Sequence, residues 1–317
     1  MALEEQILHF YLKVFSFLSI FVFYFFYLFF VREINLKNDY FFINKNENYI
    51  EIINSNIIDS NINLFIYKSS LRVLLFINKE IHFGKFKLGQ NRTFFKILKT
   101  IVLPSNFYNK ITIIEGWSKK DLNIILSKNF NDFFELNYNK IISDTYMLAE
   151  GASFLQFTKL LDKRYLLIKN KFEKHPLSKK YSFDEILIIA SLLEKEGIDY
   201  EDKKKIYSVI KNRLKLNMKL QIDATVIFSL TEGGKRDLER KLTYADLKIE
   251  NRYNTYKNYG LPPGPISYVG HKTIELILED YKTDYLFYFY NSFENKHIFS
   301  LNYKNHLKKL NEYRSKK

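Results

Sequence analysis

The stretch ILIIASLLEKEG ends a run of aliphatic residues with two carboxylates, Glu194 and Glu196. On a helix, the Glu194 side chain continues an apolar stripe formed by Leu187, Ala190 and Ser191. Burial there destabilises the ionised carboxyl, and the partial negative charge of the helix C-terminus acts in the same direction. Both effects favour a protonated carboxyl near neutral pH, the form that a general acid needs.

Glu196 is rotated from Glu194 by about 160 degrees around the helix axis, taking roughly 3.6 residues per turn. The two carboxylates are therefore not expected to act as a pair, and Glu196 is expected to matter far less for activity. The same periodicity fits equally well with both glutamates forming the exposed end of a buried helix.

A second group of polar residues lies in LQIDATVIF, residues 220–228. Asp223 precedes an apolar run, as is typical of a helix N-cap, and that role explains it without catalysis. Gln221 has no such structural role, so it is a better candidate for ligand contact.

The third group lies in YNTYKNYGLPPGPISYVG, residues 253–270, which holds three of the five prolines in the chain. Rigid loops beside aromatic and amide side chains often shape ligand clefts. The prolines are equally at home in a purely structural crossover loop. Asn254, Thr255 and Tyr256 are the stronger candidates for ligand contact, because such groups suit sugar hydroxyls and ring faces.

Several elements must position these side chains. Ser182, with Glu185 three residues later, forms a capping box that predicts the start of the glutamate-bearing helix, and Gly197 predicts its end. Because aliphatic residues cover every side of this helix, we expect it to be packed all round. A strand at 111–114, further helices and a hairpin from 285 to about 301 predict a mixed α+β domain.

The N-terminal segment Val14–Val31 carries no charge and is close to the roughly 20 apolar residues that span a bilayer. No small-residue cleavage site follows it, so we predict an uncleaved anchor. The flanking charges, Lys13 on one side and Arg32 and Lys37 on the other, do not favour an outside C-terminus. Long domains can nevertheless be translocated against such a count.

The composition argues against several classes of protein. The 317 residues carry 49 basic and 35 acidic side chains, a net charge of +14, but the lysines are scattered instead of clustered. A membrane-tethered protein that binds nucleic acid or anionic lipid would need a clustered basic face, so no nucleic-acid partner is expected. Cysteine is absent and the six histidines show no metal-ligand spacing, so no metal or cofactor is expected.

Three motifs, IIASLLEKEG, NRLKLNMKLQIDATVIF and YNTYKNYGLPPGPIS, in this order and spacing, closely resemble the YceG-like family of endolytic murein transglycosylases. The resemblance extends to ITIIEGWS, SDTYMLAEGAS and KHIFSLNYKNHLKKL, and GKFKLGQNRTFFKIL is similar to the end of the family's LysM-like module. It covers most of the chain after the anchor. Ala224, Ser143 and the pair Tyr268 and Val269 depart from the family pattern, each at a helix start or turn.

The resemblance implies an α+β fold with one N-terminal transmembrane helix, a small LysM-like α/β module and a mixed α+β catalytic domain. The predicted division is a cytoplasmic N-terminus at 1–13, the anchor at 14–31, a linker at 32–47, the LysM-like module at 48–100 and the YceG-like catalytic domain at 101–317. The expected location is the inner (cytoplasmic) membrane, single-pass, with the catalytic domain outside the cytoplasm.

The resemblance also implies an activity: internal, non-hydrolytic cleavage of the MurNAc-GlcNAc β-1,4 bond in nascent peptidoglycan, leaving 1,6-anhydro-MurNAc ends and terminating strand elongation. Wall-synthesis enzymes such as penicillin-binding proteins are the implied protein partners. The first glutamate of the EKE triplet, Glu194, corresponds to the family's catalytic residue. The alternative is an inactive glycan-binding scaffold. In either case the residues expected to bind substrate are Gln221, Asp223, Thr225, Asn254, Thr255 and Tyr256.

Overall fold

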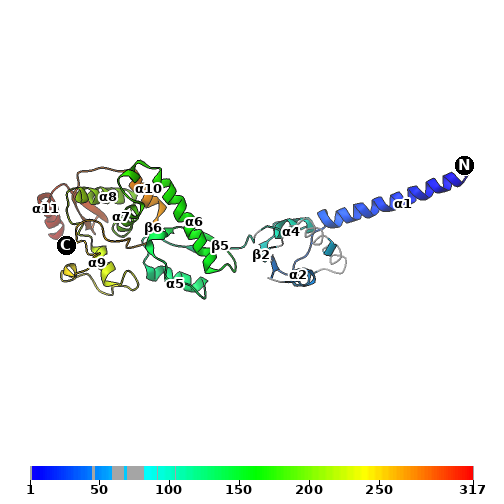
Figure 1. The fold of residues 1–317 in the computed structure, drawn as a ribbon, viewed down its shortest axis with the longest axis horizontal. Coiled ribbons are helices and arrows are strands. Elements are labelled where there is room, and N and C mark those ends of the chain that lie inside the picture. Colours follow the sequence, from blue (N-terminus) through cyan, green and yellow to red (C-terminus); the bar gives the residue numbers. More distant parts are fainter. Residues whose placement is uncertain are drawn as a thin grey trace. The chain divides into compact units, whose positions relative to one another are not determined.

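The computed structural model describes residues 2–44, 47–58, 68–69, 82–90, 92–103 and 105–316. The chain divides into two compact units, the first made of residues 1–109 and 147–152 and the second of residues 110–146 and 153–317 (Figure 1). Each unit has its own hydrophobic core. Helices and short strands alternate in both, which confirms the predicted α+β class.

The first unit begins with helix α1 (Ala2–Phe26), which continues into the π-helical turn η1 (Tyr27–Val31). The stretch Gln6–Val31 is long and apolar enough to cross a membrane, and only 6% of its most apolar window is buried. This agrees with the apolar helix predicted from the sequence, although the helix begins before Val14. Leu28 is an exception to the exposed pattern, since it lies in the core of the first unit.

Two strands and two helices surround that core. Strand β1 (Tyr40–Ile43) pairs antiparallel with β2 (Gly84–Lys87), and helices α2 (Tyr49–Asn56) and α4 (Phe94–Ile101) complete the described part. Strand β2 begins at Gly84, and Thr93 is the N-cap of α4. The segment predicted as a linker, residues 32–47, instead contains β1 and contributes buried side chains to the core. Most of the apolar runs between residues 59 and 77 lie outside the described residues.

The second unit is mainly helical, with strands that pair in twos. Strand β3 pairs with β5, β4 runs parallel to β6, and β7 and β8 form an antiparallel hairpin. Three short 3-10 turns, η2 (Tyr138–Lys140), η3 (Pro176–Lys179) and η4 (Asp246–Lys248), lie between the longer elements. The strands are β3 (Tyr108–Thr112), β4 (Ile142–Ser143), β5 (Thr145–Ala149), β6 (Val269–Gly270), β7 (Phe287–Asn291) and β8 (Lys296–Ser300). The helices are α5 (Lys119–Asn129), α6 (Phe154–Glu173), α7 (Phe183–Glu196), α8 (Tyr200–Lys215), α9 (Asp223–Leu230), α10 (His271–Leu278) and α11 (Tyr303–Arg314).

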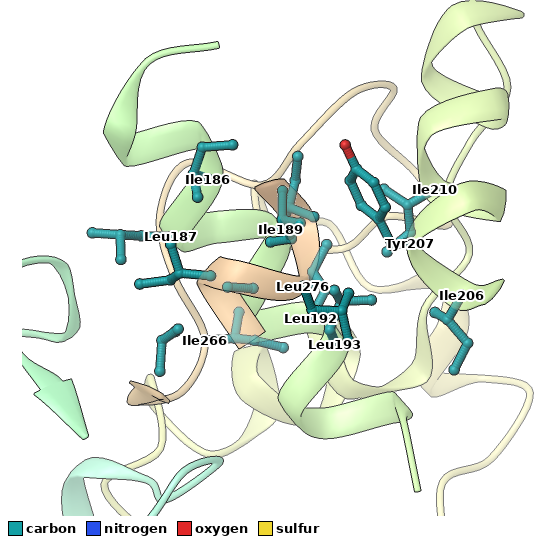
Figure 2. Packing of buried hydrophobic residues seen from close by; sticks show 14 of the residues in the cluster. Ile186, Leu187, Ile189, Leu192, Leu193, Ile206, Tyr207, Ile210, Ile266 and Leu276 are labelled. Atoms are coloured by element: carbon teal, nitrogen blue, oxygen red, sulfur yellow. The ribbon is translucent and has the colours of Figure 1, made fainter. Parts of the chain in front are cut away.

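Helix α7 is the centre of the second core. It begins with the predicted capping box, in which Ser182 accepts from the backbone N–H of Glu185 and the Glu185 carboxylate accepts from that of Ser182. Every residue from Ile186 to Leu193 is buried, and the helix contacts α6, α8, α9 and α10. Figure 2 shows its aliphatic side chains packed together with Ile206, Tyr207 and Ile210 of α8 and Leu276 of α10. Burying each such side chain contributes about 1.5–3 kcal/mol, so the helix is held from all sides as predicted.

The turn after α7 brings the start of α8 close to the C-terminal end of α7. Gly197 has extended dihedrals, φ −82° and ψ 139°, which ends the helix at Glu196. A Cβ atom at Gly197 would overlap the Lys203 side chain, so only glycine permits this approach. Asp199 caps α8 by accepting from the backbone N–H of Asp202. The turn therefore places Lys203, on the first turns of α8, beside the last turn of α7.

Candidate active site

Glu194 forms an ion pair at the end of α7. Lys203 Nζ lies 2.5 Å from Glu194 Oε2, and the backbone N–H of Gly270 donates to Oε1 at 3.2 Å. The Glu194 side chain is only 2% exposed, and Lys203 also lies 3.4 Å from Thr273 Oγ1. The predicted apolar stripe therefore does not extend to the Glu194 carboxylate, because the Lys203 ammonium group lies against it.

The EGW turn of the sequence packs against the same helix end. Gly116 has φ +78°, a conformation that suits glycine, and its N–H donates to the carbonyl of Tyr268 at 2.8 Å. A Cβ atom at Gly116 would lie 3.3 Å from the carbonyl oxygen of Glu194. Lys195 Nζ donates to the Gly116 carbonyl at 3.3 Å. The turn thus packs against Glu194 and Lys195 and holds the C-terminal end of α7 in place.

Glu196 lies in a different environment. It is partly buried, and the hydroxyl of Tyr288 on β7 donates to its Oε2 at 2.9 Å. Burial raises the pKa of the Glu196 carboxyl, the Tyr288 hydrogen bond opposes that rise, the charge of Asp223 adds to it and His297 opposes it. Glu196 thus has the raised pKa that the sequence led us to expect at Glu194.

Two tyrosines and two carboxylates form what we call the Glu196 cluster: Glu196, Tyr288, Asp223 and Tyr256. The Tyr256 hydroxyl donates to Asp223 Oδ1 at 2.6 Å. Burial raises the pKa of both tyrosines, so each remains a hydrogen-bond donor at neutral pH. Asp223 was predicted to be a helix N-cap, but this is wrong: α9 begins at Asp223 itself, Ile222 is the N-cap, and no side chain caps the helix.

A buried arginine of α8 joins the segments that carry this cluster. Arg213 Nε donates to the carbonyl of Leu286 at 2.7 Å, and Nη1 donates to that of Leu220 at 2.6 Å. Its guanidinium carbon lies 5.3 Å from the centre of the Phe287 ring, and burial lowers the pKa of the guanidinium. Arg213 thereby ties β7 to the start of the LQIDAT segment.

A histidine–aspartate pair supports the cluster from β8. His297 Nδ1 lies 2.8 Å from Asp202 Oδ2, and the two side chains are 7% and 11% exposed. The His297 ring meets the Tyr288 ring edge to face, with centroids 5.4 Å apart. Sequence reasoning missed Arg213, Tyr288, His297 and Lys203 as site residues. Of these four, only Arg213 could have been noticed in the sequence. It lies at helical spacing from Ile206 and Ile210, so it places a charged side chain on an otherwise apolar helix face.

Three of the predicted substrate-binding residues are buried and make contacts within the fold. Thr225 and Asn254 are 0% exposed and Thr255 is 2% exposed. The hydroxyls of Thr225 and Thr255 lie 3.0 Å apart, and Thr255 Oγ1 accepts from the backbone N–H of Ile222 at 2.9 Å. Thr225 and Thr255 thus hold the LQIDAT segment against the YNTY loop, and the substrate-binding role of all three residues stays a prediction.

Of the other predicted residues, Asp223 and Tyr256 belong to the Glu196 cluster. Gln221 is exposed, has φ +50° and donates its backbone N–H to the Thr255 carbonyl at 3.2 Å. Asp223 is exposed as well, and Tyr256 is partly buried. In the described ranges, no three His, Asp or Glu side chains converge in a way that could hold a metal ion. The chemistry available here is proton transfer by a carboxyl group beside tyrosine hydroxyls.

Comparison with known proteins gives curated relatives that cover part of the chain. A Bacillus subtilis protein named endolytic murein transglycosylase is 41% identical over 138 residues, which are 44% of this chain and 37% of that protein. A Streptococcus pneumoniae protein of the same name is 34% identical over 136 residues, 43% of this chain and 25% of that one. The matched stretch therefore spans well under half the length of each relative.

A solved structure and a family profile extend the comparison over more of the chain. The crystal structure of a yceG-like protein from Listeria monocytogenes matches 85% of this chain and 98% of its own, with a TM-score of 0.53 and 23% identity, which shows a shared fold. The profile of the YceG-like family matches residues 43–312. With most of its length matched in this way, the chain belongs to the YceG-like family.

Proposed function

We propose that the protein is an endolytic lytic transglycosylase that cleaves the β-1,4 bond between MurNAc and GlcNAc in peptidoglycan strands. The names of its relatives support this reaction. The observation that carries the proposal is the environment of Glu196, a partly buried carboxyl with a raised pKa, close to the Tyr288 hydroxyl and the exposed Asp223. A carboxyl that keeps its proton near neutral pH can act as a general acid.

The reaction uses one carboxyl for both proton transfers. Glu196 donates its proton to the glycosidic oxygen, the C1–O4 bond breaks, and GlcNAc leaves with a free C4 hydroxyl. The N-acetyl group of MurNAc stabilises the positive charge at C1. The Glu196 carboxylate then removes the proton from the C6 hydroxyl, and O6 bonds to C1 to close the 1,6-anhydro ring. The proton returns to Glu196 and no water is consumed.

Ordinary glycosidases need a second carboxylate as nucleophile or base. In the Glu196 cluster, the second carboxylate is Asp223, but its Oδ1 already accepts a hydrogen bond from Tyr256. We therefore assign Asp223 an electrostatic role: its negative charge helps to raise the pKa of Glu196. Tyr288 donates to Oε2 of Glu196, and the backbone N–H of Ala224 also bonds to this carboxylate.

Glu194 is the carboxyl that corresponds by resemblance to the family's catalytic residue, and its catalytic role stays a prediction. We favour Glu196 because a general acid must be able to carry a proton and must reach the substrate. Glu194 has a 2% exposed side chain and a lysine 2.5 Å away. Removing one member of such a buried pair leaves the other charge uncompensated, which is strongly destabilising.

A matched pair of variants tests the assignment. Glu196→Gln keeps the size of the side chain but cannot deliver a proton, so cleavage of purified, uncrosslinked strands should fall by about 100- to 10,000-fold. Its melting temperature should hold or rise, because the neutral amide removes the cost of a buried charge. Glu194→Gln should instead lower the melting temperature. If Glu194→Gln abolishes turnover in a fully folded protein and Glu196→Gln does not, the assignment is reversed.

Mass analysis of the products tests the reaction itself. Wild-type products should end in 1,6-anhydro-MurNAc, lighter by one water than a hydrolysed end. Reducing MurNAc ends would identify a hydrolase with Asp223 as its second carboxylate. Binding of strands without cleavage would favour the alternative, a glycan-binding scaffold.

The remaining parts of the proposal concern location and partners. The apolar helix Gln6–Val31 supports a single-pass anchor in the cytoplasmic membrane, with the rest of the chain outside, where peptidoglycan is built. We assign residues 48–100 to a LysM-like glycan-binding module, supported by the resemblance of residues 84–98 to the end of the family's module. Wall-synthesis enzymes such as penicillin-binding proteins are the proposed protein partners.

A further inference from the structure

The second unit has a pocket that the Glu196 cluster does not line. Its volume is about 530 Å³, within the range of about 300–1,000 Å³ that is typical of small-molecule sites. Six separate segments converge on it, including the start of α7, the end of α9 and the proline-rich loop. We call it the α7 N-terminal pocket, after Asp184 and Ile188 in its wall.

The position of the pocket along α7 relates it to Glu196. Glu196 follows Ile188 by eight residues of the same helix, which at roughly 1.5 Å per residue separates them by about 12 Å along the axis. This distance is longer than one sugar ring. A ligand that reached both places would have to be a chain of several sugars.

One wall of the pocket is aromatic. The ring of Phe228 lies 5.9 Å from that of Tyr138 and 4.7 Å from that of Tyr253. Tyr138 is fixed by its hydroxyl, which donates to the Gly233 carbonyl at 3.0 Å and accepts from the backbone N–H of Lys119 at 2.8 Å. Such a fixed aromatic surface suits the apolar face of a sugar ring.

The polar groups of the pocket suit hydroxyl and amide groups of a neutral ligand. Asp184 and Asn139 are exposed, and in the described part of the chain their side chains make no hydrogen bond or ion pair. Lys119, the one lysine in the lining, is already paired with Glu135 at 2.7 Å. With Asp184 and Glu232 in its wall, the pocket would repel a phosphate or nucleic acid, which needs uncompensated cations.

The proline-rich loop completes the wall opposite these groups. Pro263, Gly264 and Pro265 line the pocket and do not belong to the Glu196 cluster. A Cβ atom at Gly264 would lie 3.0 Å from the Tyr253 hydroxyl, so glycine keeps the loop against the aromatic wall. The stiff loop thus has a ligand-shaping role here, at a distance from the reacting carboxyl.

We propose that the α7 N-terminal pocket is a distal saccharide subsite, which holds the same glycan strand several sugars away from the bond cut at Glu196. This inference rests on the proposed function. A subsite at a fixed distance from the acid makes binding depend on strand length and sets a minimum spacing between the cut and the part of the strand held in the pocket.

Binding to strands of graded length tests the subsite without relying on cleavage. The full chain carrying Glu196→Gln leaves strands intact, and its Kd is measured by calorimetry with short strands and with strands long enough to reach the pocket. Long strands should bind more tightly. Adding Asp184→Asn and Asn139→Ala should weaken long-strand binding by about tenfold, the effect of one or two lost hydrogen bonds, and leave short-strand binding unchanged.

Asp162→Asn is the matched control, since this exposed carboxylate on α6 does not line the pocket. Equal weakening for short and long strands, or no weakening for long ones, would overturn the subsite. A wild-type protein that binds strands in this length-dependent way but never cuts them would refute the proposed reaction and keep the subsite. Melting temperatures identify any variant that is merely unfolded.

Discussion

At Glu194 an ammonium group lies 2.5 Å from the carboxylate, whereas at Glu196 a tyrosine hydroxyl donates from 2.9 Å. The partial negative charge of the helix end acts on both residues. A paired cation offsets the cost of burying a carboxylate, and a neutral hydroxyl offsets only part of it. In the proposed assignment, the difference between Glu194 and Glu196 therefore comes from their partners and not from their place in the helix.

Tyr288→Phe should change the pH dependence of strand cleavage. The hydroxyl stabilises the ionised form of Glu196, so its removal should raise the pKa of this carboxyl further. Because the protonated form is the acid, the loss of activity on the alkaline side should move to higher pH. The other groups that act on Glu196, Asp223 and His297, remain in place.

Tyr290→Phe is the control on the same strand, because the Tyr290 hydroxyl bonds to Asn295 and not to Glu196. The measurement is the pH profile of kcat/KM for both variants and wild type. A purely structural role of Tyr288 would lower activity at every pH and leave the profile where it was.

At the scale of elements, the YNTY loop depends on one amide side chain. Asn254 Nδ2 donates to the carbonyls of Leu247 and Ile249 at 3.1 and 2.8 Å, and Oδ1 accepts from the backbone N–H of Tyr256 at 2.9 Å. These bonds connect η4 to the residue that bonds Asp223. The Asn254 side chain therefore holds the YNTY loop in the conformation that places Tyr256 against Asp223.

Asn254→Ala should destabilise the protein by about 1–3 kcal/mol, since it leaves buried backbone groups without partners. Gln221→Ala should leave the melting temperature nearly unchanged, because this side chain is exposed. Thermal unfolding of both variants measures the contrast. Equal shifts in the two melting temperatures would contradict the structural role of Asn254.

Local signals predicted the elements better than the site. The capping box at Ser182 and the all-round packing of α7 follow from residues a few positions apart, and the structure has both. Asp223 was misread because its partner, Tyr256, lies 33 residues later in the chain. Lys203 reaches Glu194 across a turn whose geometry depends on Gly197. A single sequence shows neither contact.

At the scale of the whole molecule, the proposed topology puts Arg32 and all later residues outside the cytoplasm. Protease added to intact spheroplasts should then digest the second unit, while a cytoplasmic marker protein survives until the cells are lysed. Immunoblotting with an antibody to the C-terminus measures the loss. A fully protected C-terminus would overturn both the orientation and the proposed substrate.

The junction between membrane helix and fold has a mechanical consequence. Leu28 is buried in the first core, and the Phe29 ring meets that of Phe94 with centroids 5.2 Å apart. Because the end of the apolar helix packs directly into the first core, the distance between that helix and the first unit can change little. A flexible linker would instead let its end explore a wide volume. In the proposed orientation, the first unit can therefore search only a thin layer at the lipid surface. With the proposed substrate, we therefore expect the first unit to meet glycan strands that are still close to the membrane and not the older wall farther out.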